Sequence, residues 1–219
     1  MKNRQNHMIH SGGTKMKKPF PVYQLLCMSF ILFTSCFFHN TEANAMQPIK
    51  GKKVVMIIAK NNFRDEELLE PKAILEKNGA SVTIASSSLK ESTGMLGAKV
   101  TPDMIFTDIS VDDFDAVIFV GGSGSSEYWE NATAHKIAKD ANTANKIVGA
   151  ICIAPVTLAK AGLLKGKKAT TYSSTVNDIK SQGANYTGAG VEKDGNIITA
   201  DGPKSAKKFG ETIVKALQQ

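Results

Sequence analysis

One cysteine, Cys152, lies in a stretch whose residue types suit nucleophilic chemistry. The segment Ala150-Ile151-Cys152-Ile153-Ala154 places a small residue two positions before and two positions after the thiol, at the end of an apolar run. A nucleophile elbow has this pattern, because its tight, strained strand-to-helix turn leaves little room for larger neighbours. Pro155 then begins a short helix, whose N-terminus would favour the thiolate. The alternative is a buried structural cysteine, a common role for this residue type.

Two glycines could complete such an elbow. Gly121-Gly122 follows another apolar run and could direct a backbone N–H at the same thiol. In an elbow the second oxyanion donor is the amide after the nucleophile, which here is the amide of Ile153. The alternative is an ordinary turn in which Ser123, Ser125 and Ser126 cap the following helix. A phosphate loop is excluded because no Gly-Lys-Ser/Thr follows.

Three consecutive acids, Asp65, Glu66 and Glu67, begin a predicted helix. Glu66 shares a helical stripe with Glu70, so we predict that it belongs to a solvated face. Glu67 falls among apolar positions, next to Leu68, and should point inward. A buried carboxyl group near a thiol would have a raised pKa and could donate a hydrogen bond to the sulfur. The alternative is a charge that merely stabilises the first helical turn.

The elements that must position these residues alternate regularly along residues 46–219. We predict strands at 53–59, 81–85, 99–101, 114–120, 146–152 and 168–172, a hairpin at 191–200, and helices at 65–78, 127–144, 155–162, 175–182 and 203–217. Continuous apolar strands indicate a sheet that is covered on both faces. The pattern predicts one α/β domain, a three-layer α/β/α sandwich with a mostly parallel central sheet. In such a sheet, chemistry belongs at the carboxyl ends of the strands.

The first 45 residues have the order of an export signal. Lys17-Lys18 precedes the largely apolar residues 22–38, and Ala43-Asn44-Ala45 offers a small-x-small cleavage site. Met16 is a suitable translation start for a signal of ordinary length. A lipoprotein signal ending at Cys36 and an uncleaved membrane anchor are the alternatives. We expect an exported, periplasmic or secreted domain that contacts the membrane only if it is lipidated or its signal is retained.

Charge and cysteine content depend on this cleavage. The whole chain has a formal net charge of +7, but the signal carries five Lys/Arg and one acid, so the mature domain is near +3. That balance gives no reason to expect a nucleic-acid partner. Cys27 and Cys36 belong to the signal, which leaves Cys152 as a single thiol in an oxidising compartment.

Histidine content limits the possible mechanisms. His135 is the only imidazole after the predicted cleavage site, and it lies in a helix rich in Ala, Lys, Asp and Asn. A solvated role suits that environment, so a Cys–His dyad is poorly supported. One cysteine and one histidine cannot complete a tetrahedral zinc site. We therefore expect neither a metal nor another cofactor.

From Lys50 to Gln219 the chain resembles the DJ-1/ThiJ/PfpI family of the class I glutamine amidotransferase-like superfamily. The matching stretches occur in order and at matching spacing: Phe63 to Pro71, Val120-Gly121-Gly122, Gly149 to Pro155, and Asp201-Gly202-Pro203. The resemblance implies a flavodoxin-like fold and a homodimer. It also implies that Cys152 is the nucleophile or redox-sensitive cysteine, Glu67 its buried acid, and the amides of Gly122 and Ile153 the oxyanion donors.

Two departures from the family pattern bear on activity. Protease-like members have His directly after the cysteine, where this chain has Ile153, and other members place a His in the strand that here reads Thr170-Thr171-Tyr172-Ser173. Proteolysis is therefore disfavoured. Glu67 is left as the obvious proton carrier for any glyoxalase-, deglycase- or amidase-like reaction.

Three classes of function remain open. The first is a stress-related enzyme in which Cys152 attacks a small reactive carbonyl or acyl group while Glu67 carries the proton. The second is a redox-responsive protein whose Cys152 is oxidised to the sulfenic or sulfinic acid. The third is a holdase-like binding protein in which the elbow has no catalytic role. The missing histidines disfavour the first class, and the intact pair of Cys152 and Glu67 disfavours the third.

Overall fold

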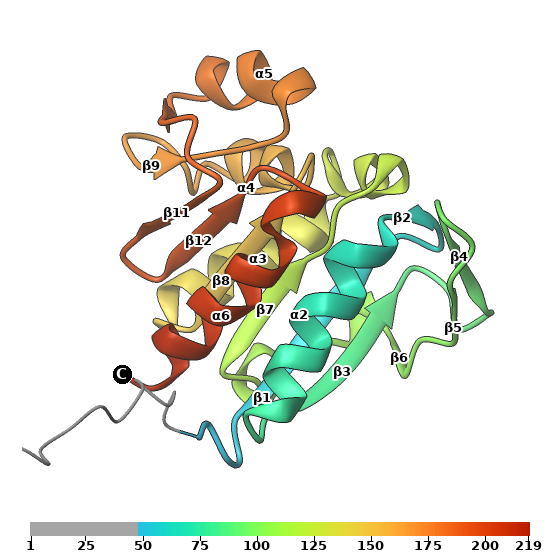
Figure 1. The fold of residues 1–219 in the computed structure, drawn as a ribbon. Helices are drawn as coiled ribbons and strands as arrows, with labels where there is room; N and C mark the ends of the chain where they lie inside the picture. The colour runs from blue at the N-terminus through green and yellow to red at the C-terminus, as the bar shows by residue number, and fades with distance from the viewer. Residues whose placement is uncertain (1–47) are drawn as a thin grey trace, which may run out of the picture. The chain divides into compact units, whose positions relative to one another are not determined.

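The central sheet of the molecule has seven strands in the order β11–β12–β8–β7–β1–β3–β6 (Figure 1). In this computed structural model, which describes residues 48–219, all neighbouring strands are parallel except the hairpin β11–β12. The strands are β1 (Lys53–Ile58), β3 (Ser81–Ser86), β6 (Met104–Ile105), β7 (Ala116–Phe119), β8 (Ile147–Ile151), β11 (Val191–Asp194) and β12 (Ile197–Ala200). The predicted signal, Met16, Cys36 and the predicted cleavage site lie outside the described residues.

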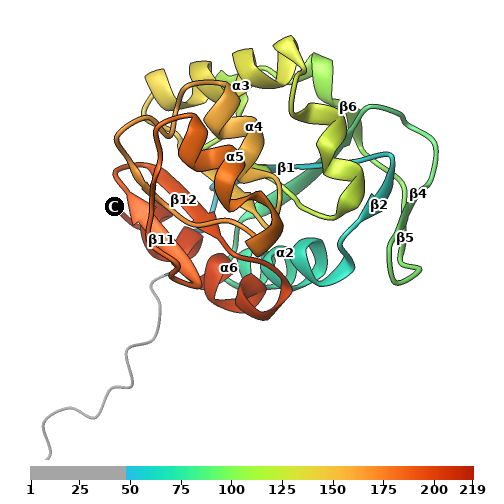
Figure 2. The same cartoon turned by 90° about the horizontal axis from the view of Figure 1, so that it is seen from above.

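Side chains of β1 alternate between two hydrophobic cores, as a sheet covered on both faces requires. Val54, Met56 and Ile58 pack on the face that carries α2 (Asp65–Lys77) and α6 (Ala206–Leu217). Val55 and Ile57 pack on the opposite face, with α3 (Ala132–Thr143) and α4 (Pro155–Lys160). Figure 2 shows these helix pairs on opposite sides of the sheet. The predicted three-layer α/β/α sandwich is therefore confirmed.

Shorter elements complete the fold around the central sheet. Two small sheets are formed by β2 (Asn61–Phe63), β4 (Ser92–Gly94) and β5 (Lys99–Val100), and by β9 (Lys168–Ala169) and β10 (Asn185–Tyr186). The remaining helical segments are α5 (Val176–Ser181) and the 3-10 turns η2 (Phe106–Asp108), η3 (Val111–Asp113), η4 (Ser123–Tyr128), η5 (Ser173–Thr175) and η6 (Pro203–Ser205). Within residues 48–219, no helix is long and apolar enough to cross a bilayer.

Several elements differ from the sequence prediction. The strand expected at 168–172 is limited to β9, which pairs with β10 outside the central sheet. The helix expected from residue 127 begins at Ala132, because the Asn131 side chain accepts hydrogen bonds from the amides of Thr133 and Ala134, both at 3.0 Å, and caps the helix there. The segment expected as an edge strand at 99–101 forms β5, which pairs with β4 in the small sheet. The edge of the central sheet is formed instead by β6, beside β3.

Candidate active site

A pocket of about 860 Å³ lies at the carboxyl edge of the central sheet, where the segments after β1, β7, β8 and β12 meet. This is the position expected for a site in an open α/β sheet. All four residues predicted from the sequence line the pocket. Its walls are formed by Arg64, Glu66, Glu67, Glu70, Met95, Gly122, Ser123, Cys152, Ile153, Tyr172, Ser174, Asp201, Gly202, Pro203 and Lys204.

Cys152 has the backbone conformation of a strained elbow. Its φ of +64° lies in the left-handed region, which a residue with a side chain rarely adopts. Three hydrogen bonds hold it there: the Cys152 amide donates to the Ala200 carbonyl at 2.9 Å, and the Cys152 carbonyl accepts at 2.8 Å from the Tyr172 amide and from Thr171 Oγ1. The predicted elbow is confirmed in its geometry. The thiol is, however, only 8% exposed.

Glu67 is a completely buried acid beside this thiol. The residue has no exposed surface, and neither carboxyl oxygen makes a hydrogen bond of regular geometry to any residue within 48–219. Gly121 provides the space: a Cβ at that position would lie 2.3 Å from Glu67 Oε2 and 2.5 Å from Cys152 Cβ. The prediction that Glu67 points inward is therefore confirmed.

Burial determines the protonation of both groups. It raises the pKa of Glu67 to about 8, although the adjacent Cys152 thiol and the positive charge of Arg64 act in the opposite direction. Burial and, after it, the negative charge of Glu67 together raise the pKa of Cys152 to about 12. The expected acidic, accessible thiol is thus not what the structure shows. The short helix after Cys152 does not overcome burial and a neighbouring carboxylate.

The two amides predicted as oxyanion donors lie beside the Cys152 sulfur. The backbone amides of Gly122 and Ile153 both act on the Cys152 sulfur and lower its pKa, against the larger effect of burial. Gly122 has φ of +99°, and a Cβ there would lie 2.3 Å from the Arg64 amide nitrogen, so this position requires glycine. The alternative, in which the serines cap the following helix, is wrong: η4 has no side-chain cap hydrogen bond, and Ser125 Oγ instead donates to the Gly122 carbonyl at 2.8 Å. The serine supports the turn that presents the amide.

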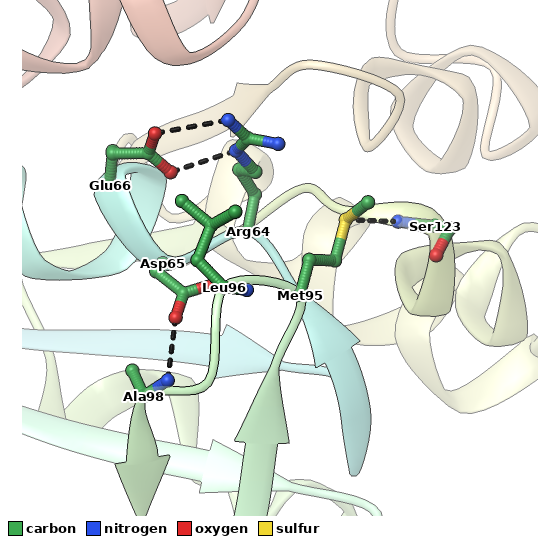
Figure 3. A network of polar contacts seen from close by, with 7 residues as sticks. All are labelled: Arg64, Asp65, Glu66, Met95, Leu96, Ala98 and Ser123. Atoms are coloured by element: carbon green, nitrogen blue, oxygen red, sulfur yellow. Dashed lines mark hydrogen bonds and ion pairs between the residues drawn. The ribbon is translucent and has the colours of Figure 1, made fainter.

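An ion pair at the pocket wall was missed by sequence reasoning. Arg64 Nε and Nη2 donate to the two carboxyl oxygens of Glu66 at 2.8 and 3.0 Å (Figure 3). Glu66 lies on the predicted solvated face, where its side chain is 32% exposed, and it also lines the pocket. Arg64 precedes α2 with extended backbone, so helical spacing could not reveal a pair two residues apart.

The β4–β5 hairpin contributes a second group of residues that the sequence did not indicate. The carboxylate of Asp65 accepts hydrogen bonds from the backbone amides of Leu96, at 2.8 Å, and Ala98, at 2.7 Å. The neighbouring Met95 extends to the pocket, where its Sδ accepts from the Ser123 amide at 3.5 Å (Figure 3). The first acid of α2 therefore positions a hairpin at the pocket mouth.

His135 does not reach the pocket. Its Nε2 lies 2.7 Å from the Trp129 carbonyl, so this nitrogen carries the proton and donates. In the segment Thr170-Thr171-Tyr172-Ser173, where the family resemblance suggested a histidine in other members, the half-exposed Tyr172 lines the pocket. Among residues 48–219, no cluster of three His, Cys, Asp or Glu side chains could hold a metal ion.

Comparison with known proteins identifies the family. The model of the DJ-1/PfpI family matches residues 52–216, and the chain belongs to this family, as the sequence motifs indicated. The match covers every element of the central sheet and all four predicted site residues.

Three relatives illustrate the similarity. An uncharacterized protein of Methanocaldococcus jannaschii is 42% identical over 192 residues, which are 86% of this chain and 93% of the relative. The deglycase PfpI of Pyrococcus furiosus is 32% identical over 164 residues, 75% of this chain and 99% of the relative. The crystal structure of a ThiJ/PfpI domain protein from Brachyspira murdochii has a TM-score of 0.75 and 31% identity, covering 78% of this chain and 98% of that structure. The flavodoxin-like fold is confirmed.

Proposed function

We propose that Cys152 and Glu67 act together on small reactive carbonyl compounds in a stress-related role. The observation that carries this proposal is the buried Glu67 carboxyl group, which has no regular hydrogen-bond partner within residues 48–219 and lies beside a thiol on a strained backbone. A buried carboxyl group without a hydrogen bond of regular geometry and a left-handed cysteine both cost folding free energy. Such costs are concentrated at sites that perform chemistry.

The chemistry follows from the positions of the groups. As Cys152 attacks, its thiol proton passes to the ionised Glu67, and the sulfur forms a bond to the carbonyl carbon while the C=O π pair moves to oxygen. The amides of Gly122 and Ile153 stabilise the developing negative charge. Glu67 then returns the proton to that oxygen, which gives a neutral hemithioacetal. A carboxyl group with a pKa of about 8 can carry a proton in both directions near neutral pH.

The names of the relatives include both carbonyl chemistry and peptide hydrolysis, since a Bacillus subtilis relative that is 33% identical over 169 residues is named a putative cysteine protease. The P. furiosus relative is named a deglycase and matches three quarters of this chain. Ile153 occupies the position after the nucleophile, where an imidazole base would be needed for the protease-like mechanism.

The test is consumption of methylglyoxal as a function of pH, with intact mass measured for the adduct. The wild-type rate should rise as the pH passes through about 8, because Glu67 then becomes the proton acceptor. Cys152→Ser should abolish consumption and adduct, and Glu67→Gln should remove the inflection. Glu76→Gln is a matched control: it lies nine residues further along α2, roughly 13 Å away along the axis. Equal profiles for the Glu67 and Glu76 variants would contradict the proposal.

A second candidate function is redox sensing at the same thiol. With its pKa raised to about 8, Glu67 is protonated at neutral pH and can donate a hydrogen bond to an oxygen of a Cys152 sulfinate. Peroxide treatment followed by peptide mass analysis distinguishes the two functions. Stable gain of two oxygen atoms at Cys152, without any methylglyoxal consumption by the untreated protein, would replace the carbonyl proposal with the redox one.

We also propose that the protein is exported and that its mature chain begins at Met46. The support is the order of Lys17-Lys18, the apolar residues 22–38 and Ala43-Asn44-Ala45. N-terminal sequencing of the protein from an extracytoplasmic fraction tests this. A mature chain that begins at a lipid-modified Cys36 would make the protein membrane-anchored and would contradict a free periplasmic or secreted form.

A further inference from the structure

We propose that Met95 is a second site of oxidant modification at the pocket mouth, and that the Ser123 backbone amide holds the sulfoxide that forms there. The proposal concerns a side chain that takes no part in the carbonyl chemistry above and does not depend on it. It rests on the exposure of Met95, on the way its hairpin is fixed, and on the hydrogen bond that its sulfur accepts.

Exposure sets Met95 apart from the other methionines within residues 48–219. Met95 is 44% exposed and lines the pocket, whereas Met56 is completely buried in β1 and Met104 is partly buried in β6. Oxidation of a thioether requires contact with the oxidant, so accessibility orders the three sulfur atoms. Met95 and Cys152 line the same pocket, so an oxidant in the pocket has access to both side chains.

The backbone around Met95 is held in place, which keeps its side chain at the pocket. The Met95 amide donates to the Phe63 carbonyl at 2.8 Å, and the Gly94 amide donates to the Ala98 carbonyl at 2.8 Å. The Asp65 carboxylate accepts hydrogen bonds from two further amides of the same turn, those of Leu96 and Ala98. Figure 3 shows the Met95 side chain reaching from this hairpin to Ser123.

The hydrogen bond from Ser123 gives the modification a structural consequence. The Ser123 amide donates to Met95 Sδ at 3.5 Å, and a thioether sulfur is a weak acceptor. The preceding amide, that of Gly122, acts on the Cys152 sulfur. Two consecutive amides of one loop thus face two oxidisable sulfur atoms. A sulfoxide oxygen is a stronger acceptor than a thioether, so oxidation of Met95 would strengthen the contact to the loop that carries the oxyanion donor.

The reaction needs only a two-electron oxidant such as a peroxide. The O–O bond breaks, one oxygen forms a bond to Met95 Sδ, and the sulfur is oxidised by two electrons while the peroxide is reduced to water or an alcohol. The added oxygen places a polar group at the pocket mouth. We expect alkylation of Cys152 to become slower, because entry is narrowed and the oxygen's partial negative charge disfavours the thiolate.

The experiment follows hydrogen peroxide oxidation of the full chain by peptide mass analysis and by the amide resonance of Ser123. In a Cys152→Ser background, Met95 should gain one oxygen atom several-fold faster than Met104, Met56 should remain unmodified, and the Ser123 resonance should shift in step. Oxidation of Met104 as fast as Met95, or no oxidation of Met95 without Cys152, would overturn the proposal. Oxidation of Met95 with an unmoved Ser123 resonance would also overturn it.

A pair of variants separates the amide contact from exposure alone. Met95→Leu conserves side-chain volume and should fold normally, and its Ser123 resonance should no longer respond to peroxide. Adding Leu96→Met to this variant creates a methionine at a position that is 62% exposed, next in the same turn but without the Ser123 partner. That methionine should oxidise without moving Ser123. The Ser123 resonance could also shift equally in the protein that retains Met95 and in the Met95→Leu/Leu96→Met variant. That result would show that any exposed sulfoxide in the hairpin moves Ser123, and it would contradict the specific contact.

Discussion

Carboxyl groups at the two edges of the central sheet have pKa values that are shifted in opposite directions. At the amino-terminal edge, Asp115 accepts hydrogen bonds from the Lys53 amide at 2.9 Å and from Lys52 Nζ at 3.1 Å. Burial alone would raise its pKa, but these two partners hold that pKa below its usual value. At the carboxyl-terminal edge, Glu67 is fully buried without such partners within residues 48–219, and its pKa is raised.

The difference shows which edge is built for stability and which for chemistry. Asp115 joins the starts of β1 and β7, so its charge supports the alignment of neighbouring strands. Glu67 joins no strands, and its ionised form is destabilised by the surrounding core. A folded protein tolerates one destabilised acid of this kind only if interactions elsewhere in the structure supply enough stability to offset its cost.

The largest expected effect is a change in the pH dependence of stability at Glu67. In the unfolded chain this carboxyl group has a pKa of about 4.3, whereas in the folded protein its pKa is about 8. The folded state therefore binds the extra proton, and stability falls as the pH rises from about 4.3 to about 8. Glu67→Gln should remove this fall and gain up to several kcal/mol at pH 8 and above. Urea unfolding across this pH range measures it, and an unchanged slope would contradict the raised pKa.

Crowding the same edge should have the next largest effect. Gly121→Ala brings a Cβ to 2.3 Å from Glu67 Oε2, so we expect a loss of about 1–3 kcal/mol of stability. Gly51→Ala at the amino-terminal edge is the control, because it has φ of +84° and no atom within 4 Å of the added Cβ. Gly51→Ala should lose only about 1 kcal/mol of stability, which is the cost of the backbone strain. Thermal melting that ranks the two variants in the reverse order would show that the carboxyl-terminal edge can relax.

Removing the carboxylate should also change the titration of the thiol. The negative charge of Glu67 is one of the causes that raise the pKa of Cys152, after burial. In Glu67→Gln the thiolate should therefore appear at lower pH than in the wild type, although still above the ordinary thiol range because the burial remains. Thiolate absorbance followed during a pH titration measures this shift. A shift to higher pH would mean that Glu67 stabilises the thiolate instead of opposing it.

The smallest expected effect belongs to the amino-terminal edge. Asp115 has a lowered pKa, so its stabilisation is present above the unfolded value of about 3.9 and is lost as the pH falls through the folded value. Asp115→Asn should cost at most about 1 kcal/mol at pH 7, because the ion pair with Lys52 is largely solvated. It should also flatten the acid limb of the stability curve. Stabilisation by this variant at pH 7 would remove the contrast between the two edges.

Much of the site could be predicted because local pattern determined it. Small residues around Cys152, the inward stripe of Glu67 and the paired glycines each reflect a steric requirement that acts within a few residues. The periodicity of apolar residues, which switches between that of strands and that of helices, predicted the three-layer architecture for the same reason. These features depend little on which distant segments pack together.

What could not be predicted depends on contacts between distant segments. The raised pKa of Cys152 needs the depth of the pocket and the approach of Glu67, neither of which helix position reveals. The role of Asp65 in holding the β4–β5 hairpin joins residues about thirty positions apart. Likewise, the extended backbone of Arg64 brings it to Glu66 and the pocket wall, where helical periodicity does not apply.

The left-handed backbone conformation of Cys152 also limits how far the thermal stability of the protein can be increased. A side chain at φ of +64° costs about 1–2 kcal/mol, a penalty that glycine alone avoids. Selection for heat resistance, applied without selection for reactivity, should therefore favour Cys152→Gly at this turn. That exchange would leave the hydrogen bonds of the turn available and delete the thiol. Thermal stability and thiol reactivity thus place opposite demands on the residue at position 152. Engineering for higher thermal stability must therefore keep Cys152 if the reactivity is to be retained.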